Sequence, residues 1–218
     1  MKKWLLFTLL INLNVVNAQL AKKNQIKLGI TVGSILSPKL NTALIPSVEF
    51  KFNNQWSAFV EIGFPVSTTQ NDSLAIHSKF FRARTEIRYY TNRHFYFGLQ
   101  FGIAYRNFDV SKKSMFYDSP SASPKRYTYD AANIQSDIYT QTLQIGNSTM
   151  LNKKFGLDIS CGIGARTIKT NYRNVVNQVE STEPRGLFYM NGISQAYFYN
   201  SHVYRAQFNM AVRVFYTL

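Results

Sequence analysis

The sequence is poor in the residues that build most metal and disulfide sites. It has one cysteine and three histidines among 218 residues. A single cysteine excludes an internal disulfide framework, a cysteine-rich zinc site and an iron–sulfur cluster. No apolar run reaches the ~18 residues that a membrane-spanning helix needs. Acidic residues are also scarce: Lys plus Arg is 25 and Asp plus Glu is 11, which gives a formal net charge of +14. We expect neither a metal nor another cofactor.

Aromatic residues, by contrast, are abundant. They make up 15% of the chain, with 17 Phe and 14 Tyr, which is typical of a folded chain and not of a disordered one. The basic excess alone would suit a nucleic-acid-binding protein. However, the basic residues are not gathered on one helix or patch, so the sequence predicts no nucleic-acid partner.

The first 18 residues have the pattern of a secretory signal peptide. Lys2 and Lys3 precede a mostly apolar stretch over 4–16, and the small residues Val16 and Ala18 precede Gln19. The alternative interpretation is a buried N-terminal helix. We expect cleavage after Ala18, export of the chain, and a mature protein over 19–218.

Alternation of apolar and polar residues runs through most of the mature chain and predicts eight β-strands. They cover 26–33, 47–52, 56–64, 81–89, 95–106, 139–146, 155–166 and 204–218. Most are close to the ~9–11 residues with which a tilted strand crosses a bilayer. The connections alternate between short (53–55, 91–93, 151–154) and long (34–41, 66–79, 107–137, 170–202).

This alternation of short and long connections is typical of an all-β, eight-stranded antiparallel up-and-down transmembrane β-barrel, with short periplasmic turns and long extracellular loops. A soluble ligand-binding barrel, with its apolar face inside, is the alternative. Nine of the 11 glycines lie on the polar face, where they would relieve crowding inside a narrow barrel. Bulky aromatics lie near strand ends on the apolar face, as in the aromatic girdles of membrane barrels. These residues are Trp56, Phe64, Phe81, Tyr89, Phe95, Tyr105, Phe155, Tyr204 and Tyr216.

Charged residues of both signs share the polar face, and we predict that they form a structural network that plugs the lumen. Buried charges need paired partners, and the guanidinium fork suits carboxylates. The predicted network is Glu49, Glu61, Arg82, Arg84, Glu86, Arg88, Asp158, Arg166, Arg205 and Arg213. Glu86 is expected between Arg84 and Arg88. With Lys27, Lys51 and Arg106, the polar face carries nine cations and four acids, or 9 − 4 = +5, which predicts bound water or anions near Arg106 and Arg166.

The strand count, the loop asymmetry and the final strand resemble the small outer-membrane barrels of the OmpA/OmpX architecture. The resemblance covers roughly 26–218. Three segments, at 45–50 (IPSVEF), 85–90 (TEIRYY) and 161–164 (CGIG), also resemble an uncharacterised family of small exported barrels. The alternating strand up to Leu218 looks like the signal read by the barrel-insertion machinery. The resemblance implies a bacterial outer-membrane location in contact with lipid and lipopolysaccharide.

Catalytic motifs are harder to find. His77 and His202 are expected at the loop rim, with Ser78 and Asp72 nearby, and a lipid-modifying rim enzyme is one alternative. A narrow pore is another. We expect no enzyme but a monomeric barrel with a structural or surface-interaction role, exerted through its extracellular loops on a partner that the sequence does not identify.

Overall fold

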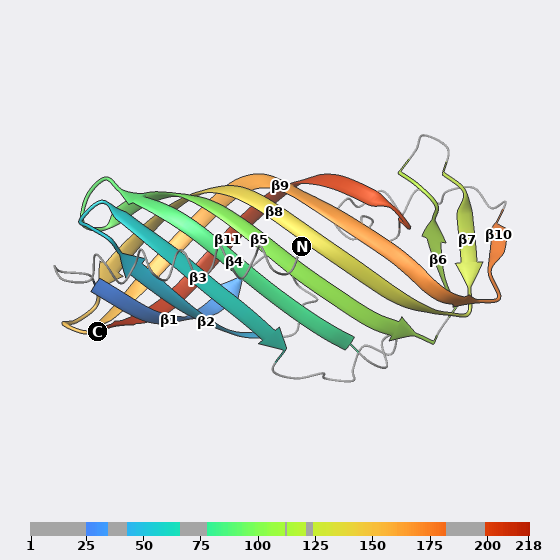
Figure 1. Cartoon of the computed structure of the whole chain (residues 1–218), viewed down its shortest axis with the longest axis horizontal. Helices are drawn as coiled ribbons and strands as arrows, with labels where there is room; N and C mark the ends of the chain where they lie inside the picture. Colours follow the sequence, from blue (N-terminus) through green and yellow to red (C-terminus); the bar gives the residue numbers. More distant parts are fainter. Residues whose placement is uncertain (1–24, 35–42, 66–77, 112, 121–123, 182–198) are drawn as a thin grey trace, which may run out of the picture.

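Eight strands of the computed structural model close into an antiparallel barrel (Figure 1). The structure describes residues 25–34, 43–65, 78–111, 113–120, 124–181 and 199–218. The barrel strands are β1 (Gln25–Ser34), β2 (Ala43–Lys51), β3 (Trp56–Pro65), β4 (Ser78–Tyr90), β5 (Phe95–Val110), β8 (Ala131–Met150), β9 (Phe155–Val176) and β11 (His202–Thr217). Their order is β1-β11-β9-β8-β5-β4-β3-β2, and β1 also pairs with β2. The eight antiparallel strands predicted from the alternation are thus confirmed.

The apolar side of each strand faces outward. Leu143 and Ile163 are each 65% exposed, whereas Arg88 and Thr142 on the other face are at most 1% exposed. This is the reverse of a soluble barrel, in which the apolar face lines the interior. The expected signal peptide over 1–18 lies outside the described residues. Within the described ranges, no helix is long and apolar enough to cross a membrane.

Three tight turns close one end of the barrel and use the same asparagine device. The side-chain oxygens of Asn53, Asn92 and Asn152 each accept hydrogen bonds from the backbone amides two and three residues later, at 2.7–2.9 Å. In each turn the residue three positions after the asparagine is aromatic and starts the next strand. Asparagine favours such turns because its side chain replaces a backbone acceptor.

The other end of the barrel differs from the sequence-based expectation. We expected loops over 107–137 and 170–202, but β5, β8 and β9 extend far into these segments. A second sheet, with strand order β10-β7-β6, lies beyond them: β6 (Ser114–Tyr117), β7 (Arg126–Tyr129) and β10 (Val179–Ser181). The extended strands and the small sheet form a projection at one end of the barrel (Figure 1).

The projection has its own apolar core. Inward residues of the extended strands, Val110, Ala132, Ile134 and Tyr172, pack with Phe116 of β6 and Tyr129 of β7. The Phe116 ring stacks on Tyr172 with centroids 4.4 Å apart. Burial raises the pKa of the Tyr172 phenol well above its ordinary value and also raises that of Tyr129, so both phenols stay neutral. The small sheet therefore covers the inner face of the extended strands.

Candidate functional site

The barrel interior holds a connected ion-pair network, and Glu61 of β3 is one of its two centres. Arg82 Nη2 lies 2.9 Å from Glu61 Oε1, and Arg84 bonds to the same oxygen. From β11, Arg213 Nη2 lies 3.7 Å from Oε2, to which the Thr31 hydroxyl donates at 3.3 Å. Glu61 is 1% exposed. One buried carboxylate thus contacts three guanidinium groups from two strands, and Arg213 Nη1 also lies 3.1 Å from Asp158 Oδ1.

Arg88 of β4 is the second centre and is fully buried. Its Nη1 lies 2.9 Å from Asp158 Oδ2 and 3.2 Å from Glu49 Oε2, while its Nε lies 3.2 Å from Glu86 Oε1. These carboxylates belong to β9, β2 and β4, so this arginine ties opposite walls of the barrel together. Such a charge is stable only while its acids remain in place.

Aromatic rings complete the packing around the arginines. Phe59 lies inside the barrel with the guanidinium carbons of Arg88 and Arg213 at 4.3 and 3.9 Å from its ring centroid. Tyr96 contacts Arg88 at 4.4 Å and donates a 3.0 Å hydrogen bond to Asp158 Oδ1. Cation–π contacts of this kind are strongest when the cation is desolvated.

Glu49 collects ligands that were not assigned to the network from the sequence. Lys27 Nζ lies 3.4 Å from Glu49 Oε2, while Tyr90 and Ser57 donate hydrogen bonds to Oε1 at 2.6 and 2.7 Å. Lys27 was counted among the inward cations, and it is the direct register partner of Glu49 on the neighbouring strand β2. The available signal for Tyr90 and Tyr96 was their parity: Tyr90 shares the polar face of its strand with Arg88, and Tyr96 shares that of its strand with Gly98.

Two glycines make room for these large interior side chains. A Cβ added to Gly146 would collide with the Tyr96 ring, and one added to Gly98 would collide with the Glu86 carboxylate. Glycine lies on the polar face at these positions because the large interior side chains leave no room for a Cβ.

The structure brings together eight of the ten predicted network residues. These eight are Glu49, Glu61, Arg82, Arg84, Glu86, Arg88, Asp158 and Arg213. Arg166 and Arg205 differ from the prediction, which placed them in the network. They face each other in register and have no ion-pair partner in the described chain. Glu86 also differs from expectation, because it pairs with Arg88 while Arg84 pairs with Glu61.

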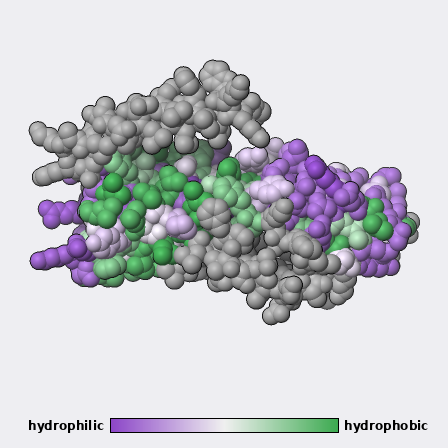
Figure 2. Space-filling model, turned by 60° about the horizontal axis from the view of Figure 1, so that its bottom comes forward, coloured by the Kyte–Doolittle hydropathy of each residue, from purple (hydrophilic) through white to green (hydrophobic). Residues whose placement is uncertain are grey.

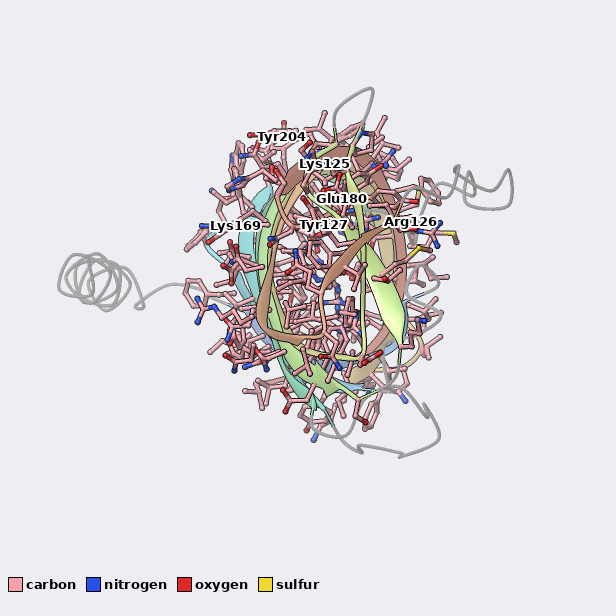
Figure 3. The ribbon with its side chains drawn as sticks, turned by 90° about the vertical axis from the view of Figure 1, so that its right-hand side faces the viewer. Lys125, Arg126, Tyr127, Lys169, Glu180 and Tyr204 are labelled. Carbon is pink, nitrogen blue, oxygen red and sulfur yellow. The ribbon has the colours of Figure 1, made fainter. Side chains whose placement is uncertain are left out.

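Uncharged side chains also cross the interior, next to the charged network: Gln100 is the register partner of Glu86. Gln144 of β8 donates to Asn209 of β11 at 3.0 Å, and Asn209 donates to Gln100 of β5 at 3.1 Å. All three side chains are buried. Figure 3 looks into the barrel from the projecting end and shows side chains occupying the space within the ring of strands.

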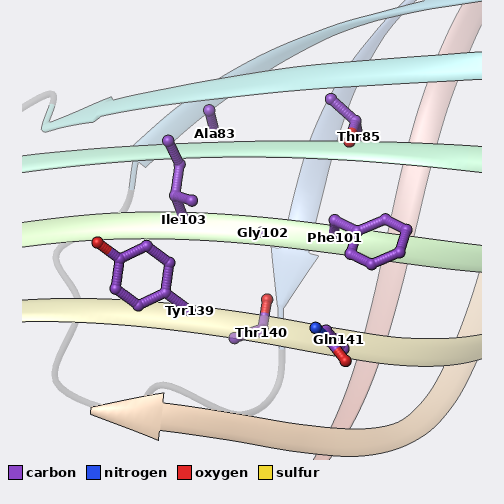
Figure 4. Close-up of a pocket in the computed structure, with 8 residues that line it drawn as sticks. All are labelled: Ala83, Thr85, Phe101, Gly102, Ile103, Tyr139, Thr140 and Gln141. Carbon is purple, nitrogen blue, oxygen red and sulfur yellow. The ribbon is translucent and has the colours of Figure 1, made fainter. Parts of the chain in front are cut away.

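The outer wall carries one shallow depression of about 290 Å³ over β4, β5 and β8 (Figure 4). Thr85 and Gln141 add polar atoms to a face that is otherwise apolar, next to Phe101, Ile103 and Tyr139. Its lining has no histidine, cysteine or carboxylate, and its polar groups are the Tyr139 phenol, the hydroxyls of Thr85 and Thr140 and the Gln141 amide.

Only part of the predicted rim site lies among the described residues. His77 and Asp72 lie outside the described residues, and Ser78 begins β4. His202 begins β11, is exposed, and pairs in register with Lys169 of β9. Within the described ranges, no group of three or more His, Cys, Asp or Glu could hold a metal ion.

The long strands exchange the polarity of their two faces along their length. On β8, the outward residues Leu143 and Ile145 are apolar, but beyond Tyr139 the outward residues are Gln135 and Asn133. The inward face changes in the opposite sense, from Gln144 and Thr142 to Ile134 and Ala132. Strands β5 and β9 show the same exchange. Figure 2 shows the outer apolar surface as a green zone with hydrophilic residues at both ends.

Comparisons with known proteins place the chain in a family without assigning it an activity. A family model described as "Protein of unknown function (DUF3575)" matches residues 5–196, and the chain belongs to this family. Among solved structures, the chain is similar to a major outer membrane protein from Thermus thermophilus, with a TM-score of 0.42 and 10% identity. That alignment covers 90% of this chain and 100% of the other. No curated protein matches the chain.

Proposed function

We propose that the chain is a bacterial outer-membrane β-barrel protein that carries its projection on the cell surface. The observation that carries this proposal is the exchange of polarity on β5, β8 and β9. A strand that turns an apolar face outward in one section and a polar face outward in the next lies in two different solvents. Lipid around the barrel and water around the projection account for both sections.

The width of the outward apolar zone fits a bilayer. On β5, the outward aromatics Phe95 and Tyr105 lie ten residues apart, which is about 33 Å along the strand. At the tilt of about 40° typical of such barrels, this corresponds to about 25 Å of height, the height of the lipid-facing band in outer-membrane barrels. Aromatic residues lie at both limits: Trp56, Tyr89, Phe155 and Tyr216 near the tight turns, and Phe81, Tyr139 and Tyr204 near the projection.

A structural or surface-interaction role follows better from this interior than transport or catalysis does. The ion-pair network and the amide chain from Gln144 to Gln100 occupy the barrel interior. The narrow-pore alternative needs an open path through that interior, and it predicts steady conductance across planar bilayers. In this proposal the apolar wall contacts lipid and lipopolysaccharide, β11 carries the signal for the insertion machinery, and the exposed surface of the projection meets an extracellular partner.

Cysteine labelling in intact cells tests the location and the orientation together. In a background in which Cys161 is replaced by serine, single cysteines are introduced by Lys125→Cys in the projection, Lys153→Cys in a tight turn and Leu99→Cys on the barrel wall. A membrane-impermeant maleimide is expected to label the first in intact cells and the second only after lysis. The third is expected to react only after unfolding, because lipid covers it.

Labelling of Lys153→Cys but not of Lys125→Cys in intact cells would invert the orientation. Rapid labelling of Leu99→Cys in the folded protein would show that water, and not lipid, surrounds the barrel. Either result would overturn the proposal.

A further inference from the structure

Two arginines in the part of the barrel next to the projection face each other without an acid between them. Arg166 of β9 and Arg205 of β11 are direct cross-strand partners, and both lie on the inward-facing side of their strands. The Nε of each is buried and has no hydrogen-bond partner, and neither guanidinium has an ion pair within the described residues. Like charges placed directly opposite each other on neighbouring strands are destabilising.

The four carboxylates of the barrel interior are already engaged by other cations. Glu49, Glu61, Glu86 and Asp158 contact Lys27, Arg82, Arg84, Arg88 and Arg213. The nearest of these acids on β9 itself, Asp158, is eight residues from Arg166, or about 26 Å along the strand. The network therefore does not supply the missing negative charge.

The surroundings of the arginine pair are suited to a small polar guest. On the side of the network, the neighbouring register pair is Gly164 and Gln207, which brings no charge and one small residue. On the side of the projection, Ile168 and Val203 are buried and pack with Ile138, which forms an apolar boundary. On β8, Thr140 is the register partner of Arg166 and brings a hydroxyl group to the same level.

We propose that Arg166 and Arg205, together with Thr140, bind a small tetrahedral oxyanion, phosphate or sulfate, in the part of the lumen next to the projection. Each guanidinium fork can donate two parallel hydrogen bonds to an oxyanion. Such an anion satisfies the unpartnered Nε donors and removes the repulsion between the two cations. It therefore stabilises the barrel as well as occupying it.

The same chemistry could come from a lipid phosphate, but the pair points away from lipid. The residues that flank the arginines on the outward face of β9 are Ala165 and Thr167, and Ala206 lies opposite Ala165 on β11. The guanidinium groups belong to the inner face of the barrel wall. We therefore assign the anion to free inorganic phosphate or sulfate that enters from the aqueous side.

Isothermal titration of inorganic phosphate into the folded full-length chain tests the site. The protein is held in a detergent without phosphate groups, and chloride keeps the ionic strength constant. Saturable binding is expected for the wild type, with at least a tenfold loss of affinity in Arg166→Gln and in Arg205→Gln. Arg93→Gln removes an exposed turn cation and is expected to bind like the wild type.

A charge reversal separates an anion site from a purely structural arginine pair. Arg166→Glu places a carboxylate opposite Arg205 and supplies the negative charge from the chain itself. Its unfolding midpoint without phosphate is expected to exceed that of the wild type, and added phosphate is expected to leave it unchanged. A merely structural role for Arg166 predicts a lower midpoint instead.

Three results would overturn the proposal. The first is the absence of saturable phosphate binding by the wild type. The second is wild-type affinity in both Arg166→Gln and Arg205→Gln. The third is stabilisation that requires vesicles of phosphate-bearing lipid and is not produced by inorganic phosphate, which would assign the oxyanion to a lipid headgroup. The test does not depend on which side of a membrane the projection occupies.

Discussion

In the barrel, β8 turns Thr142 and Gln144 inward, whereas in the projection the same strand turns Ile134 and Ala132 inward. The backbone, the alternation and the neighbouring strands are the same in both sections. The difference lies in the polarity of the side chains on the two faces. In the barrel section the outward face is apolar and the interior takes the polar residues, while in the projection the outward face is polar and the interior takes the apolar ones.

The two interiors are therefore stabilised by different physics. An apolar core gains free energy in rough proportion to the area that it removes from water, and many arrangements of similar volume satisfy it. A charged core gains only when each buried group meets its partner, and the loss of one partner leaves an uncompensated charge. The barrel interior should accordingly be less tolerant of single substitutions than the core of the projection.

The largest expected effect is that of Glu61→Ala. This change removes the carboxylate that pairs with Arg82 and Arg84 and also contacts Arg213, and it is expected to lower the free energy of unfolding by about 3–5 kcal/mol. Urea unfolding of the refolded protein, followed by gel mobility and tryptophan fluorescence, measures it. In the control Glu180→Ala, an exposed ion pair with Lys125 is lost, and the midpoint is expected to stay almost unchanged. Equal midpoints for the two variants would show that the network contributes nothing.

The core of the projection is tested by Phe116→Ala, which removes a ring stacked on Tyr172 and Tyr127. The expected loss is about 3 kcal/mol, the lower end of the range for buried Phe→Ala changes, because neighbouring apolar side chains can close part of the space. It should be confined to the projection, so that trypsin cuts sooner at Lys113 or Lys125 while the barrel keeps its folded gel mobility. Phe116→Leu keeps most of the volume and should be cut more slowly. Collapse of the barrel in Phe116→Ala would mean that the two sections do not fold separately.

The strands of the barrel could be predicted from the sequence because one face is apolar and the other polar over most of their length. The small sheet could not, because β6 buries three consecutive residues, Met115, Phe116 and Tyr117, and so shows no alternation. The extension of β8 was missed for a related reason. Its alternation continues beyond Tyr139, but the apolar residues change to the opposite parity.

Inward parity was enough to predict which charges enter the barrel, but not which of them meet. Arg88 and its partner Asp158 come from strands that are distant in sequence, at relative heights set by the stagger of the strands around the barrel. Arg166 and Arg205 have the same parity as their paired neighbours and lie eight residues from Asp158 and Arg213 along their strands. This separation can be counted in the sequence, but the residues of other strands that lie at the same level cannot.

The exchange of polarity can be tested on one strand with one type of substitution. Leu143 and Gln135 both face outward on β8, eight residues apart, on either side of Tyr139. Leu143→Arg is expected to lower the stability of the protein in lipid vesicles by roughly 2–4 kcal/mol, because it places a charge against the hydrocarbon. Gln135→Arg should change stability by less than about 0.5 kcal/mol, as is usual for surface changes in water. The difference should shrink when both variants are unfolded from a small, deformable detergent micelle, since the charge then reaches water more easily. Equal effects at the two positions in vesicles would mean that one solvent surrounds the whole of β8, and the interiors would then differ for a reason other than lipid.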